Sequence, residues 1–208
     1  MFFKGILLSI CIVSSAGAFS LKKLTDFNNQ NKQKLVEFLD NFYEVEKGKF
    51  YRSHQLTETT LDKYLKQYQI KTLVSLKGDE NAEWWQKEKA TAERNGVLFF
   101  SFFMSVVYLT SKEELLKILT IFKEAPRPIL VHCAGGADRT GEVSALWVLD
   151  QQGKDKVEAR KQLSIKYGHR IYKNSAKDYL IELWQGRDWA LNIYNDQDYP
   201  AWCRTKVK

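Results

Sequence analysis

The chain has 208 residues, of which 44% are hydrophobic and 27% are charged, a composition typical of one globular domain with a sizeable core. Lys and Arg outnumber Asp and Glu by 32 to 25, which gives a formal net charge of +7. The basic residues are spread along the chain and form no stripe with aromatic residues, which argues against nucleic-acid binding. The 3 histidines are far apart and lack ligand spacing, so no metal or other cofactor is expected.

Residues 1–18 have the three parts of a secretory signal peptide. Lys4 supplies a positive charge, an apolar run covers residues 6–13, and Ala-Gly-Ala at residues 16–18 matches an A-x-A cleavage site. The apolar run is well short of the roughly 20 residues that span a bilayer, which argues against a membrane anchor. We therefore expect cleavage after Ala18 and export to a periplasm or to the outside of the cell.

Cleavage would remove Cys11 and leave Cys133 and Cys203 as the cysteines of the mature chain. A disulfide between these two would take Cys133 out of any thiol chemistry. Cys203 is therefore either idle, which we favour, or a redox brake on Cys133.

After a lead-in at residues 19–42, we expect one domain at residues 43–208 that begins with a β-hairpin. Apolar and polar residues alternate over residues 42–53 on both sides of a Lys-Gly turn, which predicts two paired strands. A helix is expected from Thr57, and the apolar run at residues 70–76 predicts the next strand.

The same alternation of helix and strand continues through the middle of the chain. A polar helix is expected at residues 81–95 and a buried strand at residues 97–103. A Ser-x-x-Glu capping box at residues 111–114 opens a third helix, and two prolines end it.

Residues 129–132 then predict a further strand, and helical periodicity runs from Thr140 to Gly153. Two more helices are expected at residues 155–166 and 175–186. This order predicts an α/β fold in which a mostly parallel sheet of four to five strands is flanked by helices. Ligands of such sheets bind at the carboxyl ends of the strands.

The loop between the strand at residues 129–132 and the following helix has the features of an anion site. Gly135 and Gly136 can take positive φ or let a ligand approach the backbone. A loop of this kind directs N–H groups at one point, with the positive end of the helix behind them. Arg139 can bind two phosphate oxygens with its guanidinium fork. Cys133 lies at the floor of this site, where the positive surroundings favour the thiolate.

The sequence His132-Cys133, five residues and Arg139-Thr140-Gly141 resembles the signature of the cysteine-dependent phosphatases, the protein tyrosine and dual-specificity phosphatase superfamily. The resemblance covers residues 43–185. It is strongest with small bacterial enzymes of the dual-specificity type, several of which are exported.

The resemblance implies that Cys133 attacks a phosphomonoester in line and forms a cysteinyl-phosphate, which water then hydrolyses. Backbone N–H groups of the loop and the Arg139 side chain would hold the phosphate oxygens through the transition state. The predicted phosphate-binding residues are Ala134, Gly135, Gly136, Ala137, Asp138 and Arg139.

Three further residues are predicted to support this chemistry. The Thr140 hydroxyl can donate to the thiolate, or it can cap the helix that follows. His132 is expected to orient the loop through backbone hydrogen bonds. His169 can brace the loop or line the substrate entrance, or it can be a surface residue.

The general acid departs from the family pattern. Family members carry an Asp on the loop after the strand that precedes the helix at residues 111–125, and here residues 104–110 contain no carboxylate. Asp138, inside the phosphate loop, is the first candidate for the acid, although it could instead turn away and brace the loop. Asp79 or Glu80 could supply the proton instead, or the enzyme could depend on substrates with good leaving groups.

The predicted function is hydrolysis of phosphomonoesters, most of all of phosphotyrosine and other phosphorylated residues in proteins, by a monomeric enzyme. Phosphoinositides or other phospholipid headgroups are alternative substrates, and only they would imply contact with a membrane. A pseudophosphatase that binds phosphorylated partners without turnover is the alternative outside the enzyme class.

Overall fold

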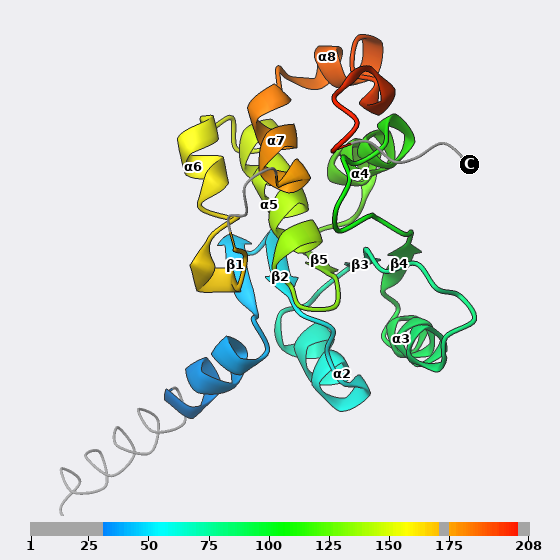
Figure 1. Ribbon diagram of the computed structural model, residues 1–208. Coiled ribbons are helices and arrows are strands. Elements are labelled where there is room, and N and C mark those ends of the chain that lie inside the picture. The colour runs from blue at the N-terminus through cyan, green and yellow to red at the C-terminus, as the bar shows by residue number, and fades with distance from the viewer. Residues whose placement is uncertain (1–30, 171–174, 204–208) are drawn as a thin grey trace, which may run out of the picture. The chain divides into compact units, whose positions relative to one another are not determined.

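The computed structural model describes residues 31–170 and 175–203 (Figure 1). The chain divides into two compact units, Met1–Phe38 and Leu39–Lys208. Residues 31–38 of the first unit are helical, and the predicted signal peptide lies outside the described residues. Within the described ranges, no helix combines the length and hydrophobicity needed to cross a membrane.

The second unit is built on one 5-stranded sheet with the order β1-β2-β5-β3-β4 (Figure 1). Only β1 and β2 are antiparallel, and the pairs β2–β5, β5–β3 and β3–β4 are parallel. The predicted hairpin and the mostly parallel sheet are therefore confirmed. The strands are β1 Tyr43–Glu46, β2 Phe50–Ser53, β3 Thr72–Ser75, β4 Leu98–Ser101 and β5 Ile129–His132.

Helices cover both faces of this sheet, with α2 and α3 on one side and α4 to α8 on the other (Figure 1). The α-helices are α2 Glu58–Gln67, α3 Glu83–Arg94, α4 Lys112–Glu124, α5 Asp138–Asp150, α6 Lys156–Arg160, α7 Ala176–Leu183 and α8 Arg187–Asn192. Short 3-10 helices follow at Ile165–Tyr167 and Asp196–Asp198. The predicted capping box at the start of α4 is confirmed, because Ser111 and Glu114 bond to each other's backbone N–H groups.

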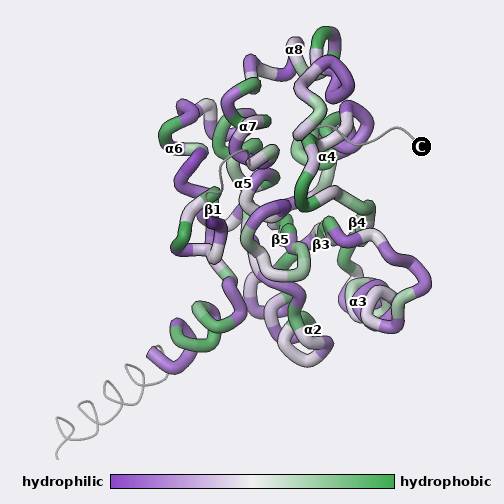
Figure 2. The backbone as a smooth tube through the Cα atoms, in the orientation of Figure 1, coloured by the Kyte–Doolittle hydropathy of each residue, from purple (hydrophilic) through white to green (hydrophobic). Residues whose placement is uncertain are grey.

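Each face of the sheet has its own apolar core, because successive strand side chains point to opposite faces. On β5, Leu130 packs with the α2 and α3 cluster, while Ile129 and Val131 pack with the cluster of α4 and α5. Figure 2 shows the central strands among the hydrophobic parts of the chain. β5 is thus buried on both faces, and its carboxyl end is held between two layers.

Two predicted elements differ from those observed. The strand at residues 97–103 was expected to be buried, but β4 is an edge strand, and Leu98 is 46% exposed. Beside β4 and α4 lies an open apolar groove of about 520 Å³ lined by Phe100 and Phe102. The continuous apolar run therefore reflects a partly covered edge rather than a central strand.

The helix predicted at residues 155–166 ends early, at Arg160. Beyond Arg160 the backbone makes tighter turns, in which Gln162 N donates to Ala159 O and Leu163 N donates to Arg160 O, and the Gln162 carbonyl accepts from Arg52 Nη1 at 2.7 Å. The turn also brings Leu163 against Gly141 of α5, where an added Cβ would lie 2.8 Å from the Leu163 side chain. α8, which follows α7, was not predicted.

Candidate active site

The predicted phosphate loop joins β5 to α5, at the carboxyl end of the middle strand of the sheet. Cys133 directly follows the strand and is 3% exposed. Gly136 has φ +68°, and a Cβ on it would lie 2.6 Å from the Ser53 carbonyl oxygen. Only glycine fits this position, because the loop there packs directly on the chain leaving β2.

Three successive carbonyl groups of the loop point outward. Ala134 O accepts from the Gln55 backbone N–H at 3.1 Å. Gly135 O accepts from Asn41 Nδ2 at 2.9 Å, and Gly136 O accepts from Arg52 Nη2 at 2.6 Å.

A trans peptide plane directs its C=O and its N–H to opposite sides. Tying the carbonyls of residues 134–136 outward therefore turns the N–H groups of residues 135–137 toward the inside of the loop. Preorganised donors of this kind form an anion site.

Arg52 is the main brace beneath the loop, and its side chain is fully buried. Its guanidinium also donates to the Gln162 side-chain oxygen at 2.9 Å and lies 3.8 Å from the centre of the Tyr167 ring. Burial lowers the pKa of Arg52 to about 10, although Tyr167 and Cys133 act in the opposite direction. The side chain is therefore still positively charged at neutral pH. Sequence reasoning missed this role, and its one signal was a charged residue within an apolar strand.

Arg139 lies in the first turn of α5 and is 8% exposed. Its Nη1 donates to Leu76 O at 2.9 Å and to Met104 O at 3.4 Å. Within the described part of the chain, Nη2 and Nε have no such partner. Because Leu76 N donates to His132 O at 2.9 Å, this anchor lies next to the strand end that carries Cys133. Nη2 and Nε are thus free to take phosphate oxygens, as the sequence predicts.

Thr140 is buried, and its Oγ1 has no hydrogen-bond partner among the described residues. α5 begins at Asp138 with Ala137 at the N-cap position, two residues earlier than predicted. Thr140 is therefore inside the first turn, and the helix-capping alternative is wrong. Its unpartnered hydroxyl fits the alternative role as a donor to the thiolate.

His169 lies between two carboxylates on the α7 side of the loop. Nδ1 is 2.6 Å from Asp138 Oδ1, and Nε2 is 2.9 Å from Asp178 Oδ2. Burial alone would lower the pKa of His169, but the hydrogen bonds to Asp138 and Asp178 outweigh it and raise the pKa to about 9. The ring is therefore an imidazolium at neutral pH. It is 2% exposed, so the surface alternative for His169 is wrong, and the roles of bracing the loop and lining the substrate entrance remain.

His132 lies on the α3 side of the loop, where its ring contacts Glu88. Nε2 is 2.8 Å from Glu88 Oε1, and both side chains are buried. Nδ1 is 3.3 Å from the Cys133 carbonyl oxygen. This placement agrees with the predicted role of orienting the loop.

The contact chain on the α3 side continues from Glu88 to a lysine. Gln55 Nε2 donates to Glu88 Oε1 at 3.0 Å, and Lys77 Nζ donates to Gln55 Oε1 at 2.8 Å. The Lys77 ammonium also lies 3.5 Å from the centre of the Trp84 ring. Sequence reasoning missed Glu88 and Lys77. The available signal for Lys77 was its position directly after a strand that ends beside the phosphate loop.

The loop after β4, at residues 102–110, contains no carboxylate and is fixed by a buried ion pair. Lys177 Nζ lies 2.9 Å from Glu142 Oε2 and donates to Tyr108 O at 2.9 Å. Thr110 Oγ1 donates to the same Glu142 oxygen at 2.8 Å. The pair joins α5, α7 and this loop.

The C-terminal segment also holds the loop after β4. Leu109 N donates to Cys203 O at 2.6 Å, and the Tyr194 hydroxyl donates to Thr110 O at 2.6 Å. Cys203 is fully buried, and its Sγ lies 3.1 Å from Pro200 O. Within the described residues, no disulfide joins Cys133 and Cys203.

The other candidate acids, Asp79 and Glu80, are exposed on the turn that leads to α3. No three His, Cys, Asp or Glu side chains of the described residues lie close enough together to hold a metal ion.

A comparison with known families gives one match to this chain. Residues 23–178 match the model of a family described as a DSP-PTPase phosphatase fused to NAD+ kinase. No curated protein matches the chain.

Solved structures of phosphatases share the fold. The core catalytic domain of the PP-IP phosphatase SIW14 from S. cerevisiae is 20% identical, with a TM-score of 0.59 over 70% of this chain and 85% of that one. TpbA from P. aeruginosa is 23% identical, with a TM-score of 0.54 over 70% and 85%. A TpbA variant in complex with pTyr is 21% identical, with a TM-score of 0.51 over 70% and 92%.

Proposed function

The chain belongs to the family of dual-specificity-type phosphatases that residues 23–178 match, and we propose that this phosphoric monoester hydrolase acts on phosphorylated proteins through a cysteinyl-phosphate. The observation that carries the proposal is the outward anchoring of the carbonyls of residues 134–136. It supports a ring of N–H donors for a phosphate held above the Cys133 sulfur.

In the first step, the Cys133 thiolate attacks phosphorus opposite the leaving oxygen. Arg139 and the loop N–H groups bind the three equatorial oxygens, where charge is spread in the transition state. In the second step, water attacks the cysteinyl-phosphate, and the sulfur leaves as a thiolate that Thr140 stabilises by hydrogen bonding. Splitting one displacement into two makes each of them easier.

Phosphotyrosine is the preferred substrate in this proposal. Support comes from the solved complex of a TpbA variant with pTyr, a protein of the same fold. Inositol phosphates and phosphoinositides are the rival class, supported by the fold shared with the PP-IP phosphatase SIW14.

The test is turnover of p-nitrophenyl phosphate by the wild type and by Cys133→Ser. We expect turnover by the wild type and none by the variant, and equal rates would refute the nucleophile. A panel of phosphotyrosine peptides and phosphoinositides then ranks the substrates by kcat/KM.

A pseudophosphatase is the second candidate, because residues 102–110 carry no acid. It predicts that the wild type binds phosphopeptides but does not turn over p-nitrophenyl phosphate.

We further propose that the protein is exported, on the strength of Lys4, the apolar run and the Ala-Gly-Ala site at residues 16–18. N-terminal sequencing of the mature chain should give Phe19 as the first residue. A retained Met1 would refute cleavage.

A further inference from the structure

Lys77 occupies the rim of the phosphate loop on the α3 side. The pairing of β3 with β5 places Ser75 opposite His132, and the ladder extends one step further because Leu76 N donates to His132 O. Lys77 therefore begins at the level of the phosphate loop. It also directly follows the residue whose carbonyl anchors Arg139.

The Lys77 ammonium is held in place by neutral groups. It donates to the Gln55 side-chain oxygen at 2.8 Å and stacks on Trp84 at 3.5 Å, and Gln55 is itself bonded to the loop through Ala134 O. Among the described residues, no carboxylate lies within ion-pair distance of Lys77. The positive charge is fixed beside the site but is not neutralised by a direct contact.

The charges that act on Lys77 include those of the catalytic pair. Burial lowers the pKa of Lys77; Glu88, Cys133 and Asp79 act in the opposite direction, and Arg139 lowers it further. A lysine with a lowered pKa gives up a proton more readily than an exposed one.

The reaction needs such a group. When the P–O bond breaks, negative charge develops on the leaving oxygen and must be neutralised unless the leaving group is very stable. Residues 102–110 offer no carboxylate, and the Asp138 oxygen Oδ1 is bonded to the His169 imidazolium.

Resting on the proposed phosphatase function, we propose that Lys77 is a catalytic residue that protonates the leaving oxygen. As the bond from the Cys133 sulfur to phosphorus forms, the P–O bond breaks and its electron pair stays on oxygen. That oxygen takes a proton from the Lys77 ammonium and leaves as an alcohol or phenol. In the second step, the attacking water gives a proton to the Lys77 amine and its hydroxyl to phosphorus. The S–P bond breaks, its electron pair stays on the Cys133 sulfur as a thiolate, and phosphate leaves with the ammonium restored.

The test compares kcat/KM of Lys77→Met and wild type on p-nitrophenyl, phenyl and benzyl phosphate, which have increasingly poor leaving groups. This parameter reports the steps up to P–O cleavage and excludes hydrolysis of the intermediate. We expect a change within about threefold on p-nitrophenyl phosphate and a loss of about 10²- to 10³-fold on benzyl phosphate. Lys77→Arg keeps the charge but holds its proton too tightly, so it should recover little of the benzyl phosphate rate.

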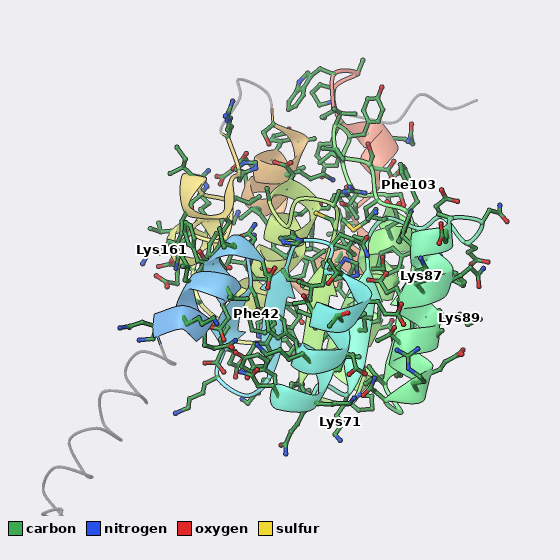
Figure 3. The ribbon with its side chains drawn as sticks, turned by 90° about the horizontal axis from the view of Figure 1, so that it is seen from below. Phe42, Lys71, Lys87, Lys89, Phe103 and Lys161 are labelled. Carbon is green, nitrogen blue, oxygen red and sulfur yellow. The ribbon has the colours of Figure 1, made fainter. Side chains whose placement is uncertain are left out.

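Lys87→Met is the matched control, because Lys87 lies on neighbouring α3 (Figure 3). Its side chain is 56% exposed and is paired with Glu83. It should behave as wild type on all three esters, and thermal melts should show that every variant is folded.

A loss of the same size on all three esters, or no loss on any, overturns the role of Lys77. Full recovery of the benzyl phosphate rate by Lys77→Arg overturns the proton transfer. If Lys77→Met changes only KM, and only for substrates that carry a second phosphate, Lys77 is a binding residue instead. The comparison of the Lys77 variants assumes that the wild type turns over the esters and that Cys133→Ser abolishes this turnover. A wild type without turnover refutes the proposed function itself.

Discussion

The two sides of the phosphate loop each carry a buried histidine, but they balance charge differently. On the α7 side, the His169 imidazolium is bonded to Asp138 and Asp178, so its charge is fully met within the protein. On the α3 side, His132 contacts Glu88, and the chain of contacts ends at Lys77, whose ammonium has neutral partners alone among the described residues.

This difference indicates which side of the loop supports the backbone and which side takes part in the reaction. A charge bonded to opposite charges on both sides is costly to move, and it fixes the backbone that carries it. A charge held by an amide oxygen and an aromatic ring keeps its field for an incoming anion. We therefore assign the α7 side to holding the loop and the α3 side to contact with the substrate.

Arg139 belongs to both sides, since it lies on α5 next to Asp138 and is anchored by the residue before Lys77. Arg139→Lys keeps a positive charge but loses the planar fork. We expect kcat on p-nitrophenyl phosphate to fall by about 10²- to 10³-fold, as when one preorganised donor to the transition state is removed. Arg187→Lys is the control, because Arg187 pairs with Asp150, outside the candidate site, and should keep full activity. An active Arg139→Lys would contradict the assignment of Arg139 to the phosphate.

Arg52 tests whether both sides depend on one support beneath the loop. Arg52→Met should leave the buried carbonyl of Gly136 and the half-buried carbonyl of Gln162 without their donor. We expect a loss of about 3 kcal/mol in the free energy of unfolding, since each unsatisfied buried group costs about 1–3 kcal/mol. Urea unfolding measures the loss. Arg52→Lys should recover only part of it, because one ammonium cannot reach both carbonyls; an unchanged midpoint in Arg52→Met would contradict the bracing role.

Sequence alone predicts those parts of the fold and of the site that are determined by residues adjacent in the chain. The apolar run before Cys133, the two glycines and the spacing to Arg139 define a strand, a loop and a helix, and the structure has all three. The same holds for the capping box of α4.

The parts that sequence alone misses come together from distant segments. Asn41 is 94 residues from the Gly135 carbonyl that it binds, and Arg52 is 84 residues from Gly136. No local pattern marks such partners. The bond from Arg52 to the Gln162 carbonyl, 110 residues away, is of the same kind.

Asp138→Asn tests whether the α7 side of the loop takes part in the reaction, because sequence alone makes Asp138 the first candidate for the general acid. The asparagine oxygen can still accept from His169, so we expect turnover of benzyl phosphate within about tenfold of wild type and an unchanged basic limb of the pH profile. The measurement is kcat/KM against pH for both proteins. A lost basic limb would make Asp138 the acid and would place the chemistry on the α7 side.

The charge on His169 gives the smallest effect, seen in stability as a function of pH. Its pKa is raised to about 9 in the folded protein from about 6.5 when unfolded. The stabilisation is therefore complete below about pH 6.5 and is lost as the pH rises through about 9. We expect the free energy of unfolding to fall by about 1 kcal/mol across this pH window. This is well below what the pKa shift of His169 alone implies, because solvent screens the partly exposed carboxylates. Urea unfolding from pH 6 to pH 10 measures it. Asp178→Asn removes one of the two carboxylates and should make the free energy of unfolding depend less on pH. An equally steep dependence in that variant would show that Asp178 does not stabilise the His169 imidazolium.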